Sequence, residues 1–448
     1  MQENIAFAEI DRWRQKLNEL SLNIWNHPEG PYREYKACEW TAELLREAGF
    51  DVQTGIGGIK TAIRASWGSG RPVIGLLGEY DALPGMSQKV CAHKEPVVPG
   101  EWGQACGHNL LGVGHVGAAI GLKKAMEEGK LSGTVVYFGC PAEEVLTGKA
   151  FMARAGVFDD IDLSVAFHPD TENNVSIGVS TGLNSFKLHF KGRTAHAGGD
   201  PHNGRSALDA VELTNVGINY LREHVPTTVR MHYVITEGGV APNIVPDSAC
   251  AWYFVRALSR ELIDEVYARV LDVAEGAAKM TGTELEVEFL GGCYPTLNNR
   301  CLGEVMYEAM CEVPQEPWTQ EELDFAAALN DDKSIPPLFT GVKPMVARNS
   351  YGSTDVGDVQ HIAPGISLET ACFNLGAPGH HWQVTASAGS SIGEKGTVFA
   401  AKVMALFGLK ILNNPELLAR AKKEFDEATA GKPYRCPIPA EIPVPNQE

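Results

Sequence analysis

The chain has 448 residues, a formal net charge of −18 and 44% hydrophobic residues. This length allows two domains with a large core, and the acidic balance excludes the basic surface of a nucleic-acid-binding protein. The 10 cysteines lack the paired spacing of a disulfide framework, so we expect free thiols in a reducing cytoplasm. The first residues show no signal-peptide pattern, and no apolar run of about 18 residues predicts a membrane span.

The first part of the chain alternates helical and strand-like patterns. Apolar periodicity predicts, in order, two helices, two strands, one helix and two strands, over residues 3–25, 37–48, 61–67, 72–79, 112–128, 134–139 and 163–167. Helices that alternate with buried apolar strands favour an α/β fold with flanking helices around a mixed, mostly parallel sheet.

A different rhythm begins near residue 184. The patterns there predict the order β-α-β-β-α-β, over residues 185–190, 206–225, 229–238, 249–258, 261–279 and 284–292. This order is typical of a ferredoxin-like unit. We therefore expect an inserted α+β domain at residues 184–297, between two parts of the α/β domain at 1–183 and 298–448.

The last part of the chain is less regular. Residues 313–345 are polar and contain prolines, which predicts a surface excursion with one short helix at 319–329. A long apolar helix is expected over 391–411. The five prolines of the tail at 432–448 exclude a helix and favour an extended segment along the surface.

Two short motifs carry most of the chemical signal. Cys106 and His108, in CGHN, flank one glycine just before a predicted helix. A thiolate and an imidazole this close could form half of a transition-metal site, although a buried cysteine beside a structural histidine explains the pattern equally well. Glu143 and Glu144, in GCPAEE, follow a predicted strand. Adjacent carboxylates repel unless a cation holds one of them, so one could bind metal while the other moves protons. The alternative interpretation of the two glutamates is an acidic turn exposed to solvent.

Three weaker motifs accompany these two. His168 and Asp81 each follow an apolar strand, in AFHPD and EYDAL, and His380 and His381 are paired in GHHWQ. Each alone is explained as a structural or capping residue, although Asp81 could orient a metal-binding histidine. Three of the five motifs lie at the end of an apolar strand, where ligands collect in open α/β sheets. The combination of thiolate, imidazole and carboxylate favours zinc, manganese or another divalent transition metal over magnesium.

Eight segments between residues 78 and 383 resemble the dinuclear metallo-amidohydrolases of the aminoacylase and carboxypeptidase family. They are, in order, GEYDALPGMSQ, ACGHNLLGVG, GCPAEE, AFHP, GRTAHAG, GGVAPNIVPDSA, STDVGDV and GHHWQ. The chain is most similar to the branch with a cysteine metal ligand, which includes hippurate and auxin-conjugate hydrolases. The resemblance implies a zinc-peptidase-like catalytic domain, an inserted lid and dimerisation domain, and two divalent metal ions, Mn²⁺ or Zn²⁺.

The resemblance also implies a metal-ligand set. Its members are Cys106 as the bridging thiolate, His108, Glu144, His168 and His380. The family pattern favours His380 over His381.

Further residues take catalytic or substrate-binding roles by the same resemblance. Glu143 corresponds to the general base that takes a proton from the attacking water. His196, in the inserted domain, corresponds to a histidine that reaches a partner subunit's active site and stabilises the oxyanion. Asn243 corresponds to a substrate contact. Arg256 is a candidate for holding a substrate carboxylate, because a fork-shaped cation suits that geometry. Asp81 would orient a ligand histidine without contacting the metal itself.

The chain departs from the branch in two places. Asn109 stands where the branch often has aspartate, which alters the hydrogen bonds around the ligands. The stretch from residue 85 to residue 104 is longer than in hippurate hydrolases and contains Cys91 and His93, and we interpret it as a substrate-pocket loop. The residues at 353–355, in STDVGDV, are interpreted as a cap for the helix that follows.

The function expected from the resemblance is metal-dependent hydrolysis of the amide bond of an N-acyl amino acid, first of all an aminobenzoyl-glutamate-like compound. Alternatives are a dipeptidase or another N-acyl-amino-acid hydrolase, and a non-catalytic partner subunit of a hydrolase complex. A cysteine hydrolase that uses Cys106 leaves the Glu143–Glu144 pair unexplained. We expect a small-molecule substrate, no nucleic acid and no membrane. The expected assembly is a homodimer, with a hetero-oligomer of related subunits as the alternative.

Overall fold

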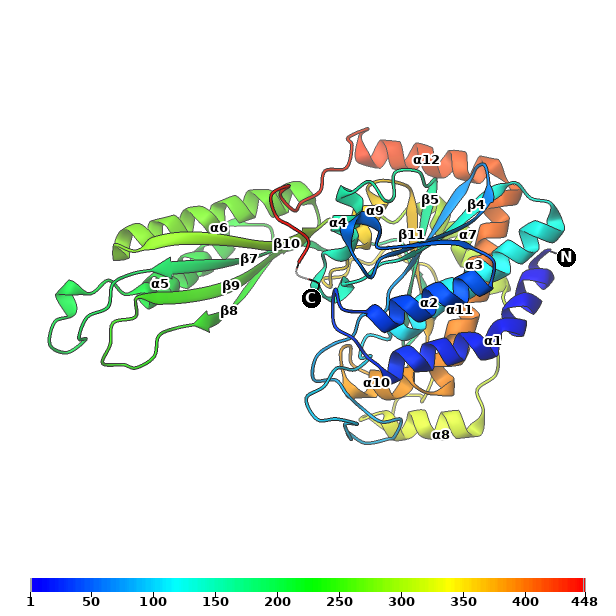
Figure 1. Cartoon of the computed structure of the whole chain (residues 1–448), viewed down its shortest axis with the longest axis horizontal. Helices are drawn as coiled ribbons and strands as arrows, with labels where there is room; N and C mark the ends of the chain where they lie inside the picture. Colours follow the sequence, from blue (N-terminus) through cyan, green and yellow to red (C-terminus); the bar gives the residue numbers. More distant parts are fainter. Residues whose placement is uncertain (1, 446, 448) are drawn as a thin grey trace.

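The computed structural model describes residues 2–445 and residue 447 and contains two β-sheets (Figure 1). The larger sheet has the strand order β1-β2-β4-β3-β5-β11-β6. Its strands are β1 (Asp51–Thr54), β2 (Ile63–Ser69), β3 (Val73–Gly78), β4 (Gly133–Gly139), β5 (Leu163–Asp170), β6 (Asn174–Ser176) and β11 (Gly365–Ala371). The neighbours β4, β3, β5 and β11 run parallel, whereas β1, β2 and β6 are antiparallel to their partners. The predicted mixed sheet with a parallel centre is confirmed.

Helices cover both faces of this sheet, and one further helix, at residues 320–329, packs against the start of the helix at 391–413 instead. They are α1 (Gln2–Asn26), α2 (Tyr35–Glu47), α3 (His108–Gly129), α4 (Gly148–Arg154), α7 (Arg300–Glu312), α8 (Gln320–Leu329), α9 (Val356–Gln360), α10 (Trp382–Ala388), α11 (Ser391–Asn413) and α12 (Pro415–Thr429). In β3, Ile74 and Leu76 pack in the core with α1, α3 and α11, whereas Val73 and Leu77 pack in the core with α4 and α9. Side chains alternate between the faces of a strand, so the sequence of a strand that is covered on both faces is a continuous run of apolar residues.

We call the larger sheet and its helices the body. The apolar helix α11 belongs to the hydrophobic core of the body. It is long and apolar enough to cross a membrane by length and composition, but 78% of its apolar window is buried inside the protein. It contacts α1, α3 and α7. Its place between other helices therefore accounts for its composition.

The smaller sheet is antiparallel, with the order β10-β7-β9-β8, and projects from the body together with two helices (Figure 1). Its elements, in chain order, are β7 (Gly182–Lys191), α5 (Ala207–Leu221), β8 (Arg230–Glu237), β9 (Ser248–Ala257), α6 (Arg260–Thr281) and β10 (Glu284–Cys293). This is the expected β-α-β-β-α-β order. We call residues 182–293 the projecting unit.

Strand β9 shows how this unit is built. Ala251, Tyr253 and Val255 are buried against α5 and α6. The alternate residues Trp252 and Phe254 point to the uncovered face of the sheet, as the two-residue period of a strand requires.

Some expectations for element boundaries were wrong. The helix expected to begin at residue 112 begins at His108, because Gly107, with φ of 78°, starts it without a side-chain cap. The strand expected to end at residue 167 continues to Asp170, so His168 lies inside β5. The short helix expected at 319–329 is confirmed as α8, which begins with a capping box formed by Thr319 and Glu322.

The proline-rich tail is not a helix over residues 432–445. It does not simply lie on the surface, because Ile438 is 1% exposed and Tyr434 and Ile442 pack with the core around α4. The tail is thus anchored by its own apolar side chains. The expectation for residues 446 and 448 lies outside the described part of the chain.

Candidate active site

A cavity of about 1390 Å³ lies between the body and the projecting unit. Its lining includes Cys106, Glu143 and His168 of the body, together with Trp252 and Arg256 of β9. These body residues lie near the ends of β4 and β5 and the start of α3. The carboxyl ends of neighbouring parallel strands meet at one edge of the sheet, and this explains why motifs far apart in sequence converge.

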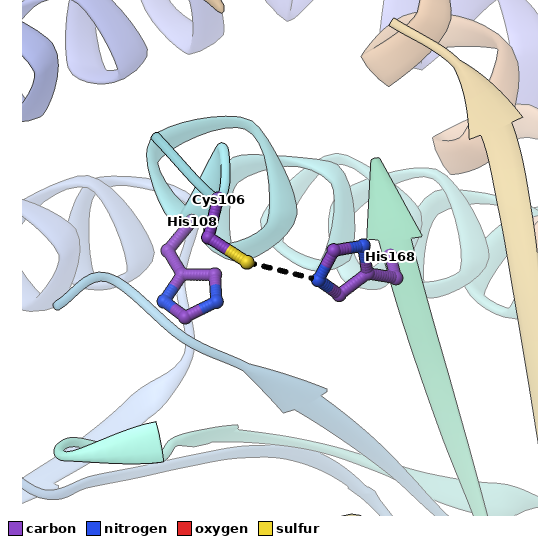
Figure 2. A group of neighbouring side chains, drawn as sticks. All are labelled: Cys106, His108 and His168. Carbon is purple, nitrogen blue, oxygen red and sulfur yellow. Dashed lines mark hydrogen bonds between the residues drawn. The ribbon is translucent and has the colours of Figure 1, made fainter. Parts of the chain in front are cut away.

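Three of the predicted metal ligands face one another (Figure 2). Cys106 and His108 project from the start of α3 and His168 from β5, and Cys106 Sγ lies 3.3 Å from His168 Nε2. Between the first two, Gly107 adopts a left-handed φ of 78°, which a residue with a Cβ rarely adopts. A Cβ there would also lie 2.8 Å from the Phe373 ring. The turn therefore depends on glycine.

The two histidine rings have their Nε2 atoms turned to the cluster. His108 Nδ1 donates a hydrogen bond to Asp81 Oδ1 at 2.9 Å, and His168 Nδ1 donates to the carbonyl oxygen of Pro169 at 2.7 Å. These bonds fix the protonated nitrogen and leave each Nε2 with a lone pair. Asp81, which is fully buried, takes the supporting position that the sequence suggested for it.

Glu144 and His380 complete the cluster. The Glu144 backbone N–H donates to Asp81 Oδ2 at 2.9 Å, so Asp81 positions this residue as well as His108. His380 Nε2 lies 3.7 Å from Glu144 Oε2. The neighbouring His381 is turned away, because its Nδ1 bonds to Gln383 Oε1 at 2.8 Å.

The ligand atoms form two groups that share one sulfur. One group is Cys106, His108 and His168, and the other is Cys106, Glu144 and His380, with all ligand atoms in a group within 4.8 Å of one another. Two cations with a shared thiolate fit this arrangement. In the described part of the chain, the buried atoms His108 Nε2 and Glu144 Oε1 have no hydrogen-bond partner and lie 3.9 Å apart. Buried polar atoms are normally satisfied, so cations bound at the two groups would explain both unpaired atoms.

The charges of the site also fit bound cations. Burial raises the pKa of Glu143 well above its ordinary value, and the neighbouring Glu79 raises it further. Burial raises the pKa of Glu144 to about 7, and it raises the pKa of the Cys106 thiol as well. Nearby divalent cations would favour the ionised forms of all three groups. The residues present therefore fit two divalent metal ions.

Two buried residues next to the cluster, Lys149 and Glu79, were not predicted from the sequence. Lys149 Nζ lies 2.6 Å from Glu79 Oε1 and 2.6 Å from Asp355 Oδ1. Glu79 in turn lies 3.5 Å from His108 Nε2. The signal available in the sequence was a lysine inside the otherwise apolar stretch GKAFMA, which follows the two glutamates.

The expected capping role of residues 353–355 was only partly right. Thr354 Oγ1 accepts a hydrogen bond from the Val356 N–H at 3.2 Å, as a capping side chain does. Asp355 makes no side-chain cap, because its carboxylate accepts hydrogen bonds from the backbone and side chain of Lys149. Ser353 Oγ accepts a bond from Arg256 Nη1 at 2.8 Å.

His196 and Asn243 do not lie with the cluster. The Ala197 N–H donates to the Asn243 carbonyl, so the two loops are neighbours, and both side chains are exposed. Both loops lie beyond the end of β7 that is remote from the body. A strand of ten residues spans about 30 Å. Neither residue is among the described residues that line the cavity, whereas Arg256 is.

Asn109 also lies outside the cluster. Its Nδ2 donates to Ser21 Oγ at 2.9 Å and to the Ala388 carbonyl at 3.2 Å. Its side chain therefore joins α3 to α1 and α10. The departure from aspartate at this position concerns helix packing more than the ligands.

Comparisons with known proteins agree with this geometry. Residues 180–281 match the peptidase dimerisation domain of M20 enzymes. The chain is 39% identical to one of the p-aminobenzoyl-glutamate hydrolase subunits of Escherichia coli strain K12, over 99% of both chains. It is 30% identical to the Xaa-Arg dipeptidase of Mus musculus, over 94% of this chain and 91% of the relative.

Solved structures share the fold. A dinuclear metal-binding M20 peptidase from Bacillus subtilis superposes with a TM-score of 0.62 at 20% identity, over 90% of this chain and 99% of that one. The fold and the site define a metal-dependent hydrolase of amide bonds. The chain belongs to the M20 peptidase family.

Proposed function

We propose that this enzyme hydrolyses the amide bond of an N-acyl amino acid that carries carboxylates, with aminobenzoyl-glutamate as the first candidate. The observation that supports this proposal is a set of unpaired guanidinium groups. Arg33, Arg256 and Arg348 line the cavity, and no carboxylate pairs with them among the residues that the structure describes. Guanidinium groups bind carboxylates in two-point geometry, so they suit a substrate with two such groups.

The walls of the cavity support an aromatic acyl group. Tyr32, Trp102, Trp252, Phe254 and Phe373 all line it. Aromatic rings stack on or contact a benzoyl group edge to face. The 30% identity to an Xaa-Arg dipeptidase supports a dipeptide as the second candidate, but three unpaired arginines disfavour a cationic side chain.

In the proposed mechanism, Glu143 takes the proton of the attacking water and passes it to the leaving nitrogen. Two divalent cations held by Cys106 and the other four ligands would polarise the scissile carbonyl and acidify the water. We propose Mn²⁺ or Zn²⁺, because the ligands combine thiolate, imidazole and carboxylate. A thiolate ligand requires a reduced cysteine, and the ten cysteines are free in the structure, which supports a cytoplasmic location.

Replacing Arg256 tests the substrate class. In Arg256→Ala we expect KM for aminobenzoyl-glutamate to rise by about 10- to 100-fold, because a charged hydrogen bond to the substrate is lost. KM for a dipeptide with a C-terminal arginine should change less. The matched control is Arg269→Ala on the outer surface of α6, which should leave both values unchanged. Equal effects of Arg256→Ala on all substrates would contradict a carboxylate-binding role.

We further propose that the chain forms a homodimer through the projecting unit. Strand β8 is an edge strand whose Val234 and Ile235 are 57% and 45% exposed. On α5, Val216 and Tyr220 are 50% and 76% exposed. An edge strand and an apolar helix face of this kind suit a second copy of the chain. Because the relative in Escherichia coli is named as one subunit of its enzyme, a hetero-oligomer with a related chain is the alternative.

His196 is proposed to act in the active site of the partner subunit. Its Nδ1 accepts hydrogen bonds from the N–H groups of Gly198 at 3.1 Å and Gly199 at 3.0 Å. In the neutral ring the proton is then on Nε2, which is free to donate to an oxyanion. The distance along β7 between this loop and the body explains why the histidine would serve another subunit's site.

Mixing two inactive variants tests this assignment. Glu143→Gln and His196→Ala homodimers should each be nearly inactive. After subunit exchange, a mixed dimer has one site with both Glu143 and the partner's histidine, so about a quarter of wild-type activity should return. Light scattering of each homodimer is the control for assembly. If His196 served its own site, no mixed site would be complete, and the mixture would stay inactive.

A further inference from the structure

A second cluster of ligand-type side chains lies outside the active site, in the loop at residues 85–104. His93 Nε2 is 2.9 Å from Glu95 Oε2, and Cys91 Sγ is 3.9 Å from the same oxygen. The three ligand atoms lie within 4.8 Å of one another. In a tetrahedral zinc site, ligand atoms are separated by about 3.3–3.5 Å. Small side-chain rotations would therefore place one cation between the three atoms.

This loop is held in shape by a buried glutamine. Gln88, which is 2% exposed, accepts a hydrogen bond from the Glu95 N–H at 2.8 Å. Its Nε2 donates to the carbonyls of His93 at 2.8 Å and Lys89 at 3.0 Å and lies 3.5 Å from Cys91 Sγ. The Lys89 N–H also donates to the Glu95 carbonyl at 2.9 Å. One buried amide thus fixes the backbone that carries all three ligand-type side chains, so little ordering is needed on binding.

The base of the loop joins it to the wall of the active-site cavity. Leu83 and Gly103 exchange two backbone hydrogen bonds of 3.0 Å, and the Ser87 N–H donates to the Glu101 carbonyl. Leu83 and Trp102 both line the cavity. A cation at the tip would therefore restrain a loop whose base forms part of the substrate-binding wall.

We propose that Cys91, His93 and Glu95 bind one divalent transition-metal ion, zinc first, with water as the fourth ligand. The thiol of Cys91 loses its proton to solvent when the metal–sulfur bond forms. The imidazole and carboxylate are solvent-exposed, so the ion can enter without opening the fold. Lys89 pairs with the other oxygen of Glu95, so Oε2 remains available for the ion. This site shares no residue with the dinuclear cluster.

The test measures zinc protection of Cys91 in the full-length protein. After chelator treatment and dialysis, Zn²⁺ is added and the rate of alkylation of each cysteine by iodoacetamide is followed by peptide mass spectrometry. We expect zinc to slow alkylation of Cys91 by at least about tenfold, since a metal-bound thiolate is a poorer nucleophile. Cys311, an exposed cysteine on α7, is the internal control and should react at an unchanged rate.

Two variants make the result specific. His93→Ala should abolish the protection of Cys91, and Cys91→Ser should bind one zinc equivalent fewer per chain than the wild type. Equal alkylation rates of Cys91 with and without zinc, or unchanged stoichiometry in Cys91→Ser, would overturn the proposal. The alkylation rate of Cys106 reports zinc binding at the active site. Loss of zinc binding at the active site is therefore distinguished from loss of zinc binding at Cys91.

Discussion

Replacing Glu143 with glutamine is expected to lower kcat for amide hydrolysis by about 10²- to 10⁴-fold. The amide has nearly the shape of the carboxylate but cannot accept the proton of the attacking water. Glu143 lines the cavity, and its Oε2 lies 3.9 Å from His108 Nε2. The carboxylate is therefore close to the ligand atoms that would hold the cations. KM should change little, because substrate recognition is assigned to the arginines and aromatic walls.

Metal content separates this role from that of the neighbouring carboxylate. Glu143→Gln should keep the wild-type number of metal ions, measured by elemental analysis after dialysis. Glu144→Gln should lose both metal and activity, because Glu144 belongs to one of the two ligand groups. This pair of adjacent variants is a matched comparison, since both replace a carboxylate on the same short turn.

Other outcomes would identify a different chemistry. Full activity of Glu143→Gln would exclude it as the base, and an unchanged rate in an assembled complex would favour a non-catalytic subunit. Cys106 lies close to His168, as in a thiol hydrolase. Such an enzyme would stay active after chelation, whereas a dinuclear metalloenzyme would not. Burial raises the pKa of the Cys106 thiol, which disfavours a free thiolate nucleophile.

The parts of the fold predicted from the sequence are those with one dominant local pattern. Strand β3 is apolar throughout because both of its faces are covered, and the long helices α3 and α11 are apolar because most of their residues are buried. The parallel strand β11 was missed, because Ser367 and Glu369 line the cavity and interrupt its apolar run. A strand that lines a site carries polar residues for function, and this weakens the signal of a buried strand.

In the candidate site, too, the residues that were predicted are those with a local sequence pattern. Cys106 and the Glu143–Glu144 pair were found because the chemistry lies in neighbouring residues. The local sequence does not distinguish His380 from His381 and the choice came from the family resemblance, because the direction of each ring depends on the left-handed turn at His380, where φ is 53°. Lys149 was missed because its partner Asp355 is 206 residues away, and no local pattern indicates that contact.

Lys149 gives the largest expected effect on stability. In Lys149→Met, the buried carboxylates of Glu79 and Asp355 lose a common cation that lies 2.6 Å from each. Removing one partner of a buried ion pair costs about 3–5 kcal/mol, because the remaining charge is left uncompensated in a low-dielectric interior. We expect the metal-free variant to unfold at a much lower urea concentration than the wild type, as followed by circular dichroism.

A surface lysine provides the matched control. Lys423 on α12 has an exposed side chain and forms an i,i+4 pair with Glu427. Lys423→Met should therefore change stability by less than about 1 kcal/mol. If both lysine variants unfolded at the same urea concentration, the buried network would not contribute to stability in this way.

The same variant also relates the stability of the body to its metal ions. Adding Asp355→Asn to Lys149→Met removes one of the two unpaired charges, so the double variant should recover part of the lost stability. Divalent cations bound near Glu79 and Glu143 would supply positive charge to the same region. We therefore expect added metal to reduce the difference between Lys149→Met and the wild type, because a ligand that binds the folded state stabilises it. If the defect were one of packing alone, the difference would be the same with and without metal. A smaller difference in the presence of metal would show that the buried lysine and the metal ions contribute to one electrostatic balance, in which Lys149 limits the repulsion of the carboxylates before the ions bind.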